Sequence, residues 1–167
     1  MANIIQAIIT DDGREALAKS FGGVSGGFDW SYGNYFKIGT GAFVDTGIDL
    51  EPVTPDPSLS DIQSVVSGIF WYRKTFEPSD ILFISPATIQ FRCFLDLEEA
   101  NGDISNEPDT LPNQDGPKNS VSLGSAAPKF FEIGVFDKQD KMVGYGTFPA
   151  ETKLNTKTLN HLVKFNF

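Results

Sequence analysis

The order of apolar and polar residues predicts a chain of short strands with one helix close to its start. Residues 4–9 form an apolar, β-branched run that favours a short first strand or a buried segment leading into the fold. After them, Leu17 and Phe21 lie four positions apart, which places both on one face of a helix of about three turns. Thr10 or Asp11 can cap the first turn of this helix, and a pair of glycines follows its last turn.

Beyond the helix, several short runs alternate between apolar and polar side chains, as expected of strands with one buried face. We predict strands over residues 34–43, 69–76, 80–85, 87–97 and 158–167. The clearest unit is a hairpin in which residues 130–136 and 142–148 flank the polar turn DKQDK. In the run 87–97, one face is predicted to carry Ile89, Phe91, Cys93, Leu95 and Leu97.

Two segments between these strands have unusual compositions. Residues 22–34 are rich in glycine and serine yet carry Phe28, Trp30 and Tyr32, which favours a packed loop or a strand over a free linker. Residues 101–129 are polar and contain four prolines. Because loops of this length are uncommon in compact domains, we expect a long surface loop or arm that serves a function.

Residues 45–62 are acidic and rich in proline, which favours extended backbone. Ser58 or Ser60 is expected to cap a single helical turn there. The predicted fold is a single domain over residues 1–167 of the α+β, mainly β class. One N-terminal helix is followed by about seven short, mostly antiparallel strands in a sandwich-like sheet arrangement.

Composition and charge narrow the classes of function. Aromatic residues make up 13% of the chain, and the net charge is −9. An acidic chain repels both the phosphate backbone and anionic lipids, so neither a nucleic acid nor a membrane is an expected partner. A single cysteine excludes a domain built on intrachain disulfides, and no run is long and apolar enough to span a bilayer. The start of the chain lacks a basic signal-peptide region, so we expect assembly in a cytoplasm.

The residue types that support catalysis or metal binding are scarce. His161 is the only histidine, and we expect it to be a hydrogen-bonded residue of an apolar strand, since no G-x-S-x-G motif accompanies it. Cys93 is expected to be a small buried hydrophobe. Two acidic groups leave calcium binding open, namely Asp137 with Asp140 and Asp45 with Asp49 and Glu51, but solvated turn acids are the favoured interpretation of both. Gly39 and its neighbours lack the lysine of a phosphate loop. We therefore predict no enzyme activity, cofactor, metal or small-molecule substrate.

Several stretches resemble a known family when they are taken in order. The chain opens with IIQAIITDDGREALAKSF, continues with NYFKIGTGAF and PVTPDPSLSDI, and closes with FFEIGVFDKQDKMVGYGTFP and NHLVKFNF. These stretches resemble the N-terminal domain of bacteriophage tail-collar and tail-fibre proteins. That family likewise has a strand-to-helix unit, a glycine-containing strand, a proline-rich crossing, a hairpin and a closing apolar strand.

The resemblance implies a structural protein of the virion that attaches or connects tail fibres to the baseplate or the tail end. Its partners would be other tail, baseplate and fibre proteins, it would usually be a homotrimer, and it would be assembled in the cytoplasm of the host bacterium. If 167 residues are the whole product, it would be an adaptor without a shaft or a receptor-binding tip. Edge strands and arms dock by adding to a neighbour's sheet, so we expect the contacts to come from the N-terminal unit and the 101–128 arm. The candidate contact residues are Ile4, Ile5, Ile8, Leu17, Phe21, Trp30, Tyr32, Leu111 and Phe167.

A carbohydrate-binding module that recognises glycans of the host surface is the alternative. Aromatic rings stack on sugar rings, and the chain offers candidates for such a platform. These are Trp30, Tyr32, Trp71 and Tyr72. Binding of host polysaccharide, followed by tryptophan fluorescence, would distinguish this class from a structural protein.

Overall fold

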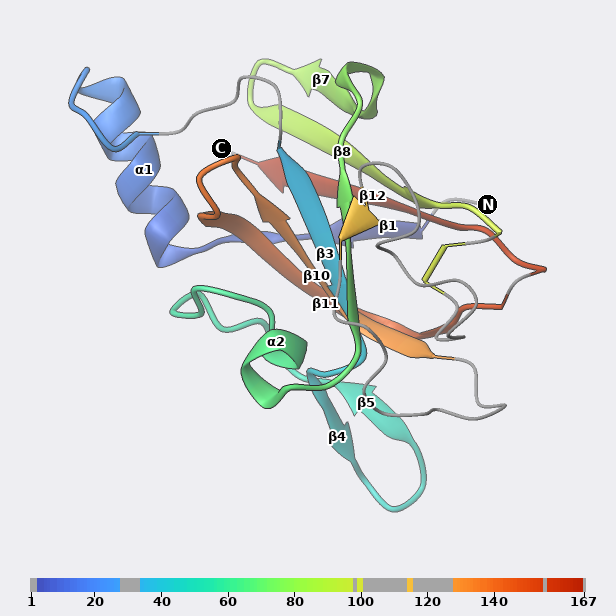
Figure 1. The fold of residues 1–167 in the computed structure, drawn as a ribbon. Coiled ribbons are helices and arrows are strands. Elements are labelled where there is room, and N and C mark those ends of the chain that lie inside the picture. Colours follow the sequence, from blue (N-terminus) through green and yellow to red (C-terminus); the bar gives the residue numbers. More distant parts are fainter. Residues whose placement is uncertain are drawn as a thin grey trace.

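Two β-sheets packed face to face form the body of the protein, with two α-helices outside them, in the part of the chain that the structure describes (Figure 1). The structure is a computed structural model. It describes residues 3–27, 34–97, 99–100, 114–115, 128–154 and 156–166.

The first sheet has four strands in the order β1-β12-β8-β7. Its members are β1 (Asn3–Gln6), β12 (Leu159–Asn166), β8 (Thr88–Leu95) and β7 (Ile81–Ser85). Strand β12 pairs parallel with β1 and antiparallel with β8. The alternation predicted for β12 is confirmed, because Leu159, His161, Val163 and Phe165 are buried.

The second sheet has six strands in the order β2-β11-β10-β3-β6-β9. Its members are β2 (Ile8–Ile9), β11 (Met142–Thr152), β10 (Lys129–Phe136), β3 (Tyr35–Gly39), β6 (Trp71–Thr75) and β9 (Gln114–Asp115). The predicted hairpin is confirmed as β10 and β11, which pair antiparallel. The predicted first strand is divided, since the chain leaves the first sheet after Gln6 and enters the second at Ile8.

The remaining elements lie outside the two sheets. Strands β4 (Phe43–Asp45) and β5 (Leu50–Pro52) form a separate hairpin that projects from the body (Figure 1). Helix α1 (Asp11–Phe21) matches the predicted helix, and the Thr10 hydroxyl caps it by accepting a hydrogen bond from the Gly13 backbone N–H at 3.0 Å. Helix α2 (Gln63–Ser67) is short, and a 3₁₀ turn spans Pro78–Asp80.

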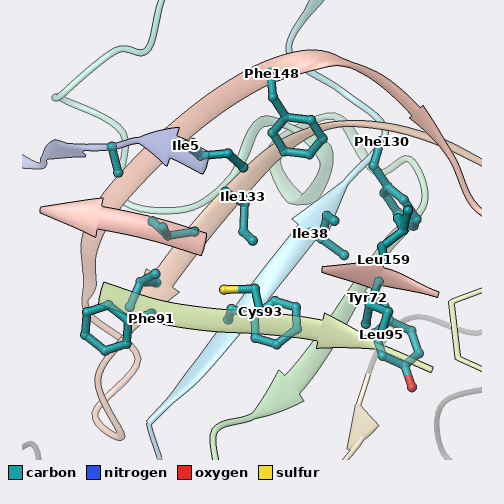
Figure 2. Packing of buried hydrophobic residues seen from close by; sticks show 14 of the residues in the cluster. Ile5, Ile38, Tyr72, Phe91, Cys93, Leu95, Phe130, Ile133, Phe148 and Leu159 are labelled. Carbon is teal, nitrogen blue, oxygen red and sulfur yellow. The ribbon is translucent and has the colours of Figure 1, made fainter. Parts of the chain in front are cut away.

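The main core lies between the two sheets (Figure 2). Its first half comes from inward-facing residues of β1, β8 and β12, and its second half from β3, β6, β10 and β11. Aromatic rings dominate, including an edge-to-face pair between Phe91 and Phe165 with ring centres 5.6 Å apart. A smaller cluster lies on the other face of the six-stranded sheet, where the segment before α2 covers Tyr35, Phe136, Met142 and Tyr145. The predicted α+β, mainly β class with sandwiched sheets is confirmed.

Some local predictions were wrong. Leu97 does not continue the buried face of β8, because the strand ends at Leu95 and Leu97 is exposed. The helical turn expected after Ser58 or Ser60 begins later, at Gln63, and its N-cap residue Ile62 offers no side-chain oxygen. The aromatic run of residues 28–33 and the segments 101–113 and 116–127 lie outside the described residues.

His161 is buried as predicted, but it is not hydrogen-bonded as predicted. Its ring packs on the Phe148 ring with centres 4.6 Å apart, and neither ring nitrogen has a hydrogen-bond partner among the described residues. Burial lowers the pKa of His161 to about 4, while Glu151 raises it and Lys157 lowers it by smaller amounts. The folded protein therefore holds the imidazole in its neutral form.

This burial predicts a pH dependence of stability. Between pH 6.5 and about 4 the unfolded chain binds a proton that the folded chain excludes, so the free energy of unfolding falls as the pH falls. Denaturant unfolding at pH 7.5 and pH 5 should show the wild type losing about 2 kcal/mol more than the His161→Leu variant. Equal losses in both proteins would show that His161 is accessible to protons in the folded state.

Candidate docking surfaces

Three projecting parts of the described chain carry large apolar side chains that solvent reaches almost completely. Phe21 at the end of α1 is 98% exposed, Ile48 in the β4–β5 turn is 97% exposed, and Phe83 of β7 is 83% exposed. Figure 1 shows these three elements at separate extremities of the molecule. Single exposed apolar residues are common, but exposed apolar positions gathered at projections are typical of contact surfaces.

The β4–β5 hairpin holds its tip in a defined shape. The Asp45 side chain accepts a hydrogen bond from the Gly47 backbone N–H at 2.8 Å, and Gly47 has a φ of +79°, which favours glycine. At its base, the Phe43 ring packs on the Phe131 ring with centres 5.0 Å apart. These contacts fix the position at which Ile48 points into solvent.

This hairpin lies in an acidic part of the chain. No lysine or arginine occurs between Lys37 and Arg73. The same stretch contains five acids, Asp45, Asp49, Glu51, Asp56 and Asp61. Lys37 neutralises one of them, because its ammonium lies 2.8 Å from the Asp61 carboxylate. Asp45 and Asp49 therefore place two acidic side chains in the same turn as the apolar tip.

A buried carboxylate joins the hairpin side of the molecule to the sheets. Glu132 of β10 is fully buried. One of its oxygens accepts hydrogen bonds from the Ser64 backbone N–H at 2.7 Å and from the Ser64 hydroxyl. The other accepts from the Gln63 backbone N–H at 2.9 Å and from the Tyr145 hydroxyl at 2.6 Å. Glu132 therefore supplies the cap that the N-terminus of α2 lacks in its own sequence.

Gly39 at the end of β3 and the nearby Gly41 make room for this carboxylate. A Cβ atom on Gly39 would collide with the Ser64 hydroxyl and lie 2.7 Å from the Glu132 carboxylate. The Gly41 backbone N–H donates to the Ser64 hydroxyl at 2.8 Å. These glycines therefore permit close packing around a polar contact.

A second polar cluster lies at both ends of the segment 101–127. The buried Glu99 carboxylate accepts from the Lys74 ammonium at 2.7 Å and from the Asp96 backbone N–H at 2.8 Å. The buried Lys153 ammonium donates to the Leu97 carbonyl at 3.2 Å, and its backbone N–H donates to the Pro128 carbonyl at 2.9 Å. Burial lowers the pKa of Lys153 to about 8. Buried charged groups thus hold the start of that segment, and a backbone hydrogen bond of Lys153 holds its end.

Two of the side chains considered above for chemistry, Cys93 and Asp137, are buried in the structure. Cys93 is fully buried, and burial raises the pKa of its thiol. Asp137 is buried, so the prediction that it is a solvated turn acid was wrong. Its carboxylate accepts from the Gln139 and Lys141 backbone N–H groups at 2.9 and 3.0 Å and holds the β10–β11 turn. No group of three or more His, Cys, Asp or Glu residues within the described ranges is arranged to hold a metal ion.

The predicted contact residues fall into different environments. Ile4 and Phe21 are exposed, whereas Ile8 and Leu17 are partly buried. Ile5 packs in the core between the sheets and cannot contact a partner in this fold. The other candidates lie outside the described residues, namely Trp30, Tyr32, Leu111 and Phe167. Sequence reasoning missed Ile48, Phe83 and Glu132, although an acid within the apolar run FFEIGVF is a visible anomaly.

Comparisons with family models, with curated proteins and with solved structures found no match for this chain. A search of the described helices found none that is long and apolar enough to cross a membrane.

The Glu132 contacts predict a large loss of stability in the Glu132→Gln variant. The new amide N–H₂ would face donors rather than acceptors, and buried donors would lose their partners. The free energy of unfolding in urea should fall by about 3 kcal/mol. Tyr145→Phe, which removes one of the four donors, should cost about 1 kcal/mol. Equal, small losses in both variants would show that the carboxylate is not the cap of α2.

Proposed function

We propose that this protein is a non-catalytic docking component of a phage tail that connects tail fibres to the baseplate or the tail end. Its partners would be other tail, baseplate and fibre proteins, and it would be located in the virion after assembly in the cytoplasm of the host. The observation that carries the docking role is the exposure of Phe21, Ile48 and Phe83 at three separate projections. A protein that joins several neighbours needs separate contact surfaces of this kind.

The phage assignment is supported by the order of the sequence stretches that resemble tail-collar and tail-fibre proteins. Their expected elements occur in the same order in the described chain. The strand-to-helix unit is β1, β2 and α1, the hairpin is β10 and β11, and the closing apolar strand is β12. The expected 101–128 arm lies largely outside the described residues, so its proposed role in contacts rests on the sequence alone.

A non-catalytic role is supported by what the buried polar groups do. His161 packs on Phe148 inside the core, and Cys93 is enclosed there as well. Glu132 and Asp137 accept hydrogen bonds that hold α2 and a turn. A catalytic base or nucleophile has to reach a substrate, and none of these groups is exposed to one.

The carbohydrate-binding alternative has less support. Tyr72 is fully buried in the core, so it cannot form a stacking platform. Trp71 is partly buried, and the Lys37 ammonium lies 4.9 Å from the centre of its ring. The other two aromatic candidates, Trp30 and Tyr32, lie outside the described residues.

The docking role predicts that charge placed on the exposed apolar projections blocks assembly without unfolding the protein. Ile48→Asp and Phe21→Asp should leave the thermal midpoint within about 3 °C of the wild type, because both side chains are exposed. Each should sharply reduce the amount of this chain, and of fibre proteins, in purified particles, measured by quantitative mass spectrometry. Thr156→Asp places the same charge at another exposed position and should assemble normally.

The same measurement can contradict the proposal. Absence of the wild-type chain from purified particles of its own virus would exclude a structural role in the virion. Normal incorporation of both Ile48→Asp and Phe21→Asp would exclude these projections as the docking surfaces.

A further inference from the structure

Strand β7 is an edge of the four-stranded sheet, and no described segment pairs with its outer side. Among the described residues it pairs with β8 on one side and with no strand on the other. Three consecutive side chains, Leu82, Phe83 and Ile84, are exposed, so both faces of the strand present apolar surface. Folded proteins usually protect such an edge with lysine, proline or a covering segment, because its free N–H and C=O groups accept another strand.

The other edges of the two sheets are shorter. Strand β1 has four residues, whereas β2 and β9 have two residues each. Strand β7 has five, and no charged residue occurs from Ile81 to Phe91. The nearest acid, Asp80, lies 3.6 Å from the guanidinium of Arg92 in the same chain. This edge is therefore long and electrically neutral for a protein with a net charge of −9.

We propose that β7 pairs antiparallel with β7 of a second copy of this chain, so that two four-stranded sheets form one continuous sheet. Two copies with a net charge of −9 repel each other, and a neutral edge is where they meet without opposing like charges. A cationic partner would find no complementary charge on this strand. The second copy is therefore the occupant that the charge distribution favours.

The sequence of β7 is suited to pairing with itself. A twofold axis through Phe83 sets this residue opposite Phe83 of the second copy. The same axis sets Leu82 opposite Ile84, so apolar residues meet on both faces of the new pair. The ladder with β8 is irregular between Phe83 and Ser85, which keeps the regular stretch short. The strength of the contact therefore depends on the central side chains.

This inference does not depend on the proposed role in a tail. A contact with a twofold axis gives dimers, whereas the resemblance to fibre proteins implies trimers. Sedimentation equilibrium of the purified full chain at 5–200 µM measures the difference directly. We expect a mass that approaches twice the 18.3 kDa of one chain as the concentration rises.

Substitutions on the edge provide the test of the contact. Phe83→Lys places two ammonium groups opposite each other and should weaken dimerisation by roughly a hundredfold. Val66→Lys, at an exposed position on α2, is the matched control and should dimerise as the wild type does. Phe83→Cys should form a disulfide between two copies under mild oxidation, and Val66→Cys should not.

The measurements separate the possible results. A dimer that is lost in Phe83→Lys and cross-linked through Phe83→Cys supports the edge pairing, provided that circular dichroism shows folded variants. A wild-type monomer across this concentration range, a trimer, or a dimer that survives Phe83→Lys would overturn the proposal. The result is independent of whether the chain occurs in virus particles.

Discussion

The carboxylate of Glu132 is the contact on which the arrangement of the outer elements depends. It lies in the middle of β10, at the centre of the six-stranded sheet, and all four of its donors are uncharged. A buried carboxylate is costly unless hydrogen bonds compensate it. Because the donors come from α2 and β11, the compensation requires the helix, the strand and the glycine-containing end of β3 to be in place together. The cost of burying the Glu132 carboxylate is therefore compensated only when these elements adopt this one arrangement.

The consequence extends to the surface. The Glu132 carboxylate binds the start of α2, and residues 53–62 connect the β4–β5 hairpin to this helix. The hairpin is therefore followed by a segment whose far end is fixed to the sheet. The apolar cluster around Tyr35, Phe136 and Tyr145 lies beside the same carboxylate. The protein therefore has apolar packing on both faces of its larger sheet, and its most exposed large apolar residues, Phe21, Ile48 and Phe83, lie on the projections.

The strands and the helix could be predicted from the sequence because each is a local pattern. The alternation in β8 and β12, the β10–β11 hairpin and the Thr10 cap of α1 all depend on residues close together in the chain. The cap of α2 could not be predicted, since Glu132 lies 68 positions from Ser64. The exposure of Phe83 was equally hidden, because its strand looks like any apolar strand until its place at the sheet edge is known. His161 shows the limit of a general rule, since a buried histidine is usually hydrogen-bonded and this one packs on an aromatic ring.

The parallel pairing of β1 with β12 has a consequence for how the protein acquires its structure. Gln6 and Lys164, which face each other across this pair, are separated by 158 positions in the chain. Contacts so distant in sequence slow folding, because a long loop must close before the pair contributes any stability. The four-stranded sheet cannot be completed on the ribosome until β12 has emerged. Until then, β1 and β8 lack the strand that pairs with both of them, so their edges and apolar faces are exposed. We therefore expect the nascent chain to bind chaperones most strongly at this stage.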